Sequence, residues 1–110
     1  LNPTSEQARR FGVEVVEWAD FTPATVPIPT GPLYVTIDLD ALDPAFAPGV
    51  SHPEPGGLSV RDIVAVIARI RTQVVGADVV ELNPAHDTGD ATAIVAVKLI
   101  KELMGAMARR

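Results

Sequence analysis

Two apolar runs separated by one amphipathic stretch limit the folds open to this chain more than any other feature. Residues 33–39 and 74–82 are nearly continuous apolar runs, which are typical of strands buried on both faces. Between them, Ser59 is followed three positions later by Asp62, a near capping box that predicts the start of an amphipathic helix. A strand, a helix and a strand in this order predict a parallel pair joined by a right-handed crossover. The predicted class is therefore α/β, with helices covering both faces of a parallel sheet.

The remaining segments complete an alternating order. Residues 4–11 predict a short polar helix, and residues 91–109 predict a final helix with basic residues at its end, as the helix dipole favours. Alternating residues over 13–18 predict one more strand. Prolines cluster in 19–32 and 43–57, which we therefore expect to be loops. A long rigid loop after a strand is where α/β sheets usually keep their functional sites.

Composition excludes several classes of protein. The chain has 110 residues, enough for one small domain, and a core of aliphatic side chains is expected because 47% of residues are hydrophobic but only 5% aromatic. A net charge of −5 without a Lys/Arg cluster argues against a nucleic-acid partner. The absence of cysteine excludes disulfides, zinc–thiolate sites and cysteine nucleophiles. No apolar run approaches the roughly 20 residues that span a bilayer, so we expect a cytoplasmic protein without a membrane partner.

Acidic residues lie at the ends of both apolar runs. Asp38 and Asp40 are two positions apart, which in a strand places both carboxylates on one face, roughly 6.5–7 Å apart. Carboxylates aimed at one point repel each other unless a cation or a shared proton lies between them. Glu81 ends the second run, and the carboxyl ends of neighbouring parallel strands converge on one crevice. Since oxygen ligands favour Mg, Ca or Mn, the pattern predicts a hard-metal site, with a spare Glu suited to a planar guanidinium.

Each of these residues also has a purely structural interpretation. An isolated D-x-D pair is weak evidence for a metal, and Glu81 by itself is compatible with a solvated strand end. Asp43 precedes Pro44 and is expected to start a turn rather than to bind metal. His52 and His86 lie in loops and are expected to be surface residues or substrate-loop contacts rather than metal ligands. Asp87 and Asp90 are expected to cap the last helix.

Two longer motifs resemble a known family. T-I-D-L-D-A-L-D-P-A-F-A-P-G at 36–49 resembles the S/T-x-D-x-D-x-x-D-P-x-x-x-P-G block of the arginase/agmatinase ureohydrolases. E-L-N-P-A-H-D at 81–87 resembles the E-x-N-P-x-x-D block of the same family, in the right order and at the right separation. The resemblance implies a three-layer α/β/α fold with a parallel sheet, of which residues 1–110 would be a carboxyl-terminal fragment. The proline-rich loop looks most like the agmatinase/guanidinobutyrase branch.

The resemblance also implies a chemistry. Members of this family hydrolyse a guanidino compound, such as agmatine, to urea and an amine at a binuclear manganese site. On this basis Asp38 would bridge the two Mn²⁺ ions and Asp40 would bind one of them. Glu81 would be the catalytic residue that binds the substrate guanidinium. A homo-oligomer, a trimer or hexamer in the intact protein, is implied as well.

The sequence departs from the family in one respect. The G-G-D-H and D-A-H-x-D blocks that carry the other metal ligands do not occur in it. We therefore expect the isolated chain to be inactive and to bind Mn²⁺ weakly, and the first residue, Leu1 instead of Met, suggests a truncated or proteolysed product. One alternative is a catalytically silent ureohydrolase-like domain with a structural or assembly role. Another is an unrelated metal enzyme of phosphoryl or glycosyl transfer, against which the E-x-N-P block argues.

Overall fold

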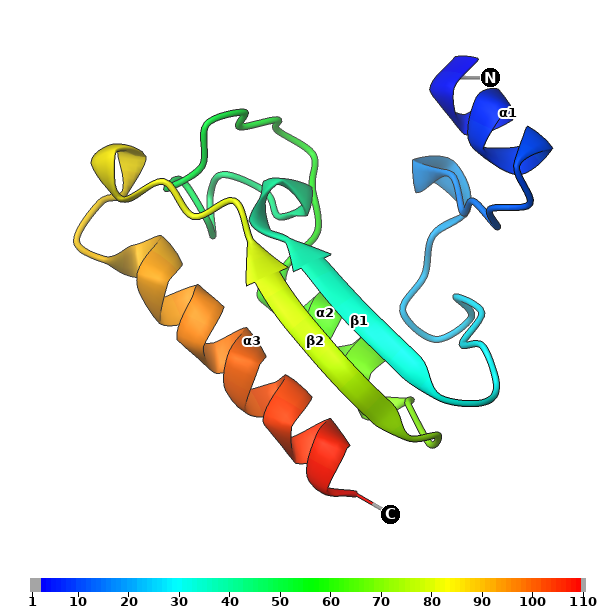
Figure 1. The fold of residues 1–110 in the computed structure, drawn as a ribbon. Coiled ribbons are helices and arrows are strands. Elements are labelled where there is room, and N and C mark those ends of the chain that lie inside the picture. The colour runs from blue at the N-terminus through cyan, green and yellow to red at the C-terminus, as the bar shows by residue number, and fades with distance from the viewer. Residues whose placement is uncertain (1–2, 110) are drawn as a thin grey trace.

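The computed structural model describes residues 3–109, in which helices and strands alternate along the chain (Figure 1). The helices and strands follow one another in the order α1 (Pro3–Arg10), β1 (Leu33–Asp38), α2 (Val60–Ala68), β2 (Val74–Val80) and α3 (Ala91–Ala108). Short 3-10 turns at Trp18–Asp20, Leu39–Ala41 and Pro84–His86 lie between them. Within the described residues, no helix has the length and apolar character needed to cross a membrane.

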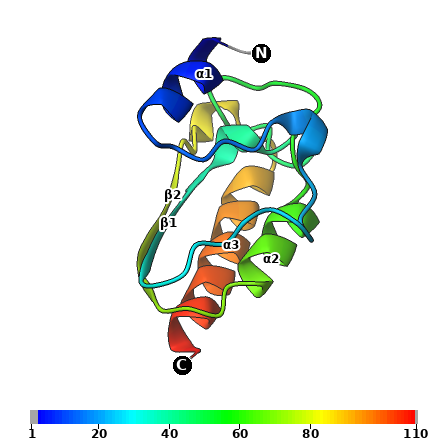
Figure 2. The same cartoon turned by 90° about the vertical axis from the view of Figure 1, so that its right-hand side faces the viewer.

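The two strands pair in parallel, which confirms the predicted α/β class. The pairing extends from Leu33 opposite Val74 to Asp38 opposite Val80, with a shift of register between Leu33 and Tyr34. Helices α2 and α3 lie on the same side of this sheet, as Figure 2 shows. The described part of the chain therefore forms two layers, one of strands and one of helices.

The core lies between these two layers. Ser59 and Asp62 form a full capping box, in which each side chain accepts a hydrogen bond from the other residue's backbone N–H, at 3.0 and 2.9 Å. The cap starts α2, whose Ile67 is buried in the same core cluster as Leu99 and Leu103 of α3. Full burial of such a side chain contributes about 1.5–3 kcal/mol. The periodicity seen in the sequence therefore corresponds to the face of each helix that packs on the sheet.

The opposite face of the sheet is open, so the prediction that both strands are buried on two faces is wrong for this chain. Tyr34 is 63% exposed and Thr36 is also exposed. Their hydroxyl groups donate hydrogen bonds to Asp78 on β2, at 2.8 and 2.5 Å. These two bonds, the one from Thr36 first, hold the pKa of Asp78 below its usual value. The open face is exposed because no helix of the described residues covers it.

The strand predicted over residues 13–18 is also wrong. Residues 13–17 are irregular and Trp18–Asp20 forms a 3-10 turn. Val13 is 53% exposed and Trp18 63% exposed. A strand exists only where its backbone groups find a neighbour to bond, and in residues 3–109 β1 and β2 pair only with each other. The alternating side chains of residues 13–18 therefore did not form a strand, because no neighbouring strand of residues 3–109 pairs with them.

Candidate metal and substrate site

Asp38 and Asp40 lie at the carboxyl end of β1, but not as two alternating residues of one strand. The strand ends at Asp38, and Asp40 belongs to the 3-10 turn Leu39–Ala41. The Asp38 carboxylate accepts a hydrogen bond from the Asp40 N–H at 2.8 Å and thereby caps this turn. The predicted placement on one strand face is therefore wrong, because a short Asp side chain competes for the backbone N–H two residues on. The turn still keeps both carboxylates at the same edge of the sheet.

One oxygen of Asp40 is buried without a hydrogen-bond partner. This atom is Oδ1, while Oδ2 lies 3.8 Å from Nδ1 of His52, whose side chain is 84% exposed. A buried carboxylate oxygen without a partner is unfavourable unless a cation or a donor binds it. The atom therefore fits the role of a metal ligand, and the oxygen donors suit a hard cation. Within residues 3–109, however, no group of three or more His, Cys, Asp or Glu side chains is arranged to hold a metal ion.

Glu81 extends from the end of the neighbouring strand. β2 ends at Val80, which pairs with Asp38, so Glu81 follows at the same edge of the sheet. Its backbone has a φ of 77°, in the left-handed region that a residue with a Cβ rarely adopts. Such a conformation costs on the order of 1–3 kcal/mol and is found preferentially at functional sites. The side chain is exposed, which leaves it accessible to a ligand.

The proline-rich loop is tied to the start of α3 through Gly49. The Gly49 N–H donates to the hydroxyl of Thr92 at 2.7 Å, and the Gly49 carbonyl accepts from the Asn83 N–H at 2.7 Å. Thr92 is fully buried. A Cβ at Gly49 would lie 2.8 Å from the side chain of Asp87 and 2.9 Å from that of Thr92. Only glycine fits this contact, which joins two loops far apart in the sequence.

Two further hydrogen bonds continue this connection. Nδ1 of His86 lies 2.9 Å from the Val50 carbonyl, and the side-chain amide of Asn83 donates to Ser51 at 3.0 Å. His52, next in the chain, is at the surface as predicted. His86 is exposed, as predicted for a surface residue, but its ring also connects two loops. The sequence carried no signal for this role, because nothing local relates position 86 to position 50.

The remaining aspartates are structural, largely as predicted. Burial raises the pKa of Asp87, but hydrogen bonds from the backbone of Thr92 and Ala93, at 2.9 and 3.0 Å, outweigh it and leave the pKa below its usual value. Asp87 thus caps α3. Asp90 occupies the N-cap position, but its side chain makes no capping bond, so that part of the prediction is wrong.

Asp43 organises the proline-rich loop. Its carboxylate accepts hydrogen bonds from the backbone of Ala45 at 2.8 Å and of Gly56 at 2.9 Å, and these lower its pKa. The Asp43 carbonyl also accepts from the N–H groups of Phe46 and Ala47. The prediction that Asp43 starts a turn is confirmed.

A parallel pair of strands with three acidic residues at its carboxyl edge defines an α/β protein with carboxylates gathered at one end of its sheet. A sequence profile of the arginase family matches residues 4–105. The chain belongs to the arginase family.

Several relatives are similar over most of this chain. It is 49% identical over 112 residues to a mitochondrial arginase of Arabidopsis thaliana, covering 94% of this chain and 33% of that protein. It is 38% identical to a guanidinopropionase of Pseudomonas aeruginosa, over 92% of this chain and 35% of that protein. An agmatinase of Halalkalibacterium halodurans is 45% identical over 75 residues, which are 66% of this chain and 26% of that protein. The chain spans about a third of the length of the curated relatives it matches.

Solved structures confirm the fold. The proclavaminate amidino hydrolase from Streptomyces clavuligerus superposes with a TM-score of 0.90 at 36% identity, over 98% of this chain and 40% of that one. The arginase from Medicago truncatula superposes with a TM-score of 0.82 at 41% identity, over 97% of this chain and 36% of that one. The predicted arginase-type α/β fold is therefore confirmed.

Proposed function

We propose that this chain is the carboxyl-terminal part of a ureohydrolase that cleaves a guanidino compound to urea and an amine. The observation that carries the proposal is the buried Oδ1 of Asp40, which lacks a hydrogen-bond partner beside Asp38. A buried carboxylate oxygen without a partner is unfavourable, and a bound ligand would offset that penalty. Glu81 lies at the same edge of the sheet, as a site for a cation and a guanidinium requires.

Manganese is the proposed metal, held in part by Asp38 and Asp40. When bound, the metal supplies Lewis-acid activation of water for the hydrolysis. The hydrogen bond from the Asp40 N–H orients the carboxylate of Asp38, so each aspartate helps to position the other. We place the remaining ligands on residues outside these 110, because the chain lacks the G-G-D-H and D-A-H-x-D blocks.

Glu81 is proposed to bind the substrate. A carboxylate pairs with a planar guanidinium through two parallel hydrogen bonds, which fixes the orientation of the group to be cleaved. The relatives are named arginase, guanidinopropionase and agmatinase. The compounds in these names all contain a guanidino group and differ in the rest of the molecule. We propose agmatine as the first substrate to test, in a cytoplasmic homo-oligomer.

A chimera tests this function directly. Residues 1–110 replace the matching region of the Arabidopsis thaliana arginase, to which they are 49% identical. With Mn²⁺, the chimera should release urea from agmatine, 4-guanidinobutyrate or arginine. The variants Asp38→Ala and Glu81→Gln should abolish this release, and Asp90→Asn, an acidic residue without a side-chain capping bond, should keep it.

The same chimera decides between the two candidate functions. A folded, oligomeric and manganese-loaded chimera without urea release from any of the three substrates would support the catalytically silent domain with an assembly role. By contrast, the 110-residue chain by itself should release no urea with Mn²⁺. Urea release by that chain, lost in Asp38→Ala, would show that the two carboxylates suffice and that the proposed incomplete site is wrong.

A further inference from the structure

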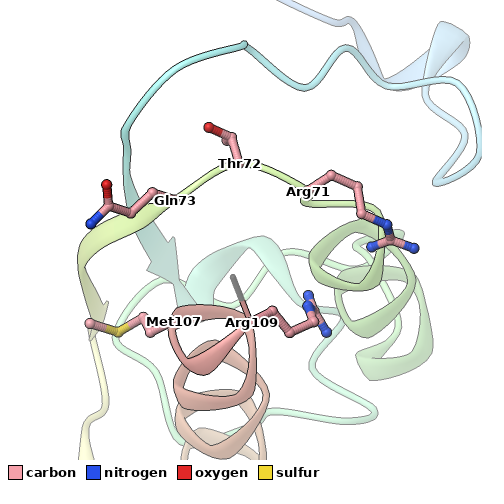
Figure 3. Close-up of a pocket in the computed structure, with 5 residues that line it drawn as sticks. All are labelled: Arg71, Thr72, Gln73, Met107 and Arg109. Atoms are coloured by element: carbon pink, nitrogen blue, oxygen red, sulfur yellow. The ribbon is translucent and has the colours of Figure 1, made fainter.

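A hollow lies at the opposite edge of the sheet from Asp38. Its volume is about 410 Å³. The residues that line it come from the segment just before β2 and from the end of α3: Arg71, Thr72, Gln73, Met107 and Arg109 (Figure 3). β1 has six residues, so at about 3.3 Å per residue the two edges are roughly 20 Å apart. The hollow is therefore distinct from the candidate metal and substrate site.

Two guanidinium groups converge on the last turn of α2 beside this hollow. Arg71 donates from Nη1 to the carbonyl oxygens of Ala68 and Ile70. Arg109 donates from Nη2 to the carbonyl oxygen of Ile67, at 3.2 Å. Since Ile67 and Ala68 are neighbours in one helical turn, the two like charges are held close together. Like charges at short range repel each other unless negative charge lies between them.

The helix ends do not balance this positive charge. The carboxyl ends of α2 and α3 meet here, and each contributes about −0.5 of an elementary charge. A third arginine, Arg69, lines a neighbouring hollow together with Arg71, and it donates to the carbonyl oxygens of Pro23 and Val26. In this hollow, the two full positive charges of Arg71 and Arg109 thus face about −1 from the helix ends. An excess of about +1 is left at the hollow.

No carboxylate of the described residues compensates the excess. The ion pairs formed within residues 3–109 involve Arg9, His52 and Lys98, and neither of the two arginines that line the hollow. Glu102 is the acid that the charge of Arg109 influences. Its pKa is lowered chiefly by the hydrogen bond and the charge of Lys98, with which it pairs at 2.6 Å, and less by Arg109. Glu102 is thus already engaged by another partner.

We propose that this hollow binds a small oxyanion with one or two negative charges, of the phosphate or carboxylate class. A guanidinium carries five N–H donors in a planar fork that matches the oxygens of both groups. The helix carbonyls engage one terminal nitrogen of Arg71 and one of Arg109, which leaves donors on each fork for a ligand. The hydroxyl of Thr72 is already bonded to the Gly31 carbonyl, so the two arginines provide the recognition.

Titration with inorganic phosphate tests the proposal. The arginine side-chain N–H resonances of the ¹⁵N-labelled chain are followed at constant ionic strength, with chloride as the replaced anion. We expect saturable shifts at Arg71 and Arg109. Arg71→Gln or Arg109→Gln should weaken phosphate binding at least tenfold. Arg61→Gln, which removes the same charge from an exposed position on α2 away from the hollow, should leave it unchanged.

A parallel titration with acetate distinguishes the two sources of the oxyanion. Binding of phosphate alone assigns the site to phosphate groups, and comparable binding of acetate assigns it to carboxylates. Should either Gln variant unfold, Arg109→Lys keeps the charge and removes the fork, and binding should fall several-fold. Shifts that do not saturate, or an equal loss in Arg61→Gln, would overturn the proposal. The experiment uses neither metal nor guanidino substrate, so its failure leaves the proposed hydrolase function untouched.

Discussion

The two edges of the sheet differ in charge and in how their side chains are held. At the carboxyl edge, Asp38, Asp40 and Glu81 are acidic, and the loops around them are joined by hydrogen bonds from Gly49 to Thr92 and Asn83. At the amino-terminal edge, three arginines bind carbonyl oxygens at the ends of helices and loops. One edge is built from loops joined to each other, and the other from single side chains on helix ends.

The difference teaches where substitutions should matter most. A hydrogen-bonded contact between two loops is lost as a whole when one small residue is enlarged, because the packed backbone cannot move aside. An exposed arginine at a helix end is replaced at little energetic expense, because water takes over its bonds. The stability of the chain should therefore depend mainly on the carboxyl edge. The acidic carboxyl edge should bind cations, and the basic amino-terminal edge should bind anions.

The largest effect is expected from Gly49→Ala. The new Cβ would lie 2.8 Å from the Asp87 side chain, so the variant should lose about 2–3 kcal/mol of unfolding free energy, in the range of overpacking. Urea denaturation followed by circular dichroism measures this loss. Gly105→Ala is the matched control: nothing lies within 4 Å of its Cβ, and it should gain about 0.5–1 kcal/mol from helix propensity. Equal stability of the two variants would show that the loop contact is not tight.

Acid should weaken the carboxyl edge through Asp87. Because hydrogen bonds to the carboxylate lower its pKa in the folded state, its stabilising effect is complete above the unfolded-state pKa of about 3.9. The effect is lost as the pH falls through the lower folded-state pKa. Unfolding free energy measured between pH 6 and 2 should therefore decrease less in Asp87→Asn than in the unchanged chain. A parallel pH dependence of the two proteins would exclude Asp87 as the cause.

Asp40→Asn should stabilise the chain while removing its affinity for Mn²⁺. Replacing a buried charged oxygen without a partner relieves a desolvation penalty of about 1 kcal/mol. Thermal unfolding with and without Mn²⁺ measures both effects: Mn²⁺ in excess over the weak Kd of the isolated chain should raise the melting temperature of the unchanged chain and not that of the variant. Asp90→Asn should behave like the unchanged chain, since its side chain makes no capping bond. A destabilised Asp40→Asn would assign Asp40 a structural role.

The smallest effect is expected from His86→Ala. The variant loses the hydrogen bond to the Val50 carbonyl and should be destabilised by about 0.5–1 kcal/mol. His52→Ala, at a side chain 84% exposed, should leave the unfolding free energy unchanged. Hydrogen exchange at Val50 and Ser51 should accelerate only in His86→Ala. Identical exchange in both variants would mean that the His86 bond does not hold the loop.

Helices were predicted best, because their signals are local. The capping box at Ser59 and Asp62, and the end of α1 before Gly12, depend on residues three or four positions apart. The parallel pairing of β1 and β2 followed from the order of elements. The strand over residues 13–18 failed because pairing depends on a neighbour that the local sequence does not specify.

The candidate site was predicted in part for the same reason. The family motifs located Asp38, Asp40 and Glu81 in the sequence, and the end of each strand located them in space. The turn that places Asp40 outside the strand depends on the hydrogen bond from the Asp40 N–H to the Asp38 carboxylate. This local bond replaces the extended backbone that a strand would have. The link between His86 and Val50 spans 36 positions and had no signal in the sequence.

By itself, then, the sequence determined the helices, the parallel order of the strands and the edge at which the carboxylates gather. These properties depend on short-range periodicity, on caps and on the direction of the chain. The tertiary structure alone decided that Gly49 packs against Thr92 and Asp87, that one oxygen of Asp40 is buried, and that Arg71 and Arg109 meet at the opposite edge. Contacts between distant residues depend on how whole elements pack, and packing is a property of the folded chain rather than of any segment.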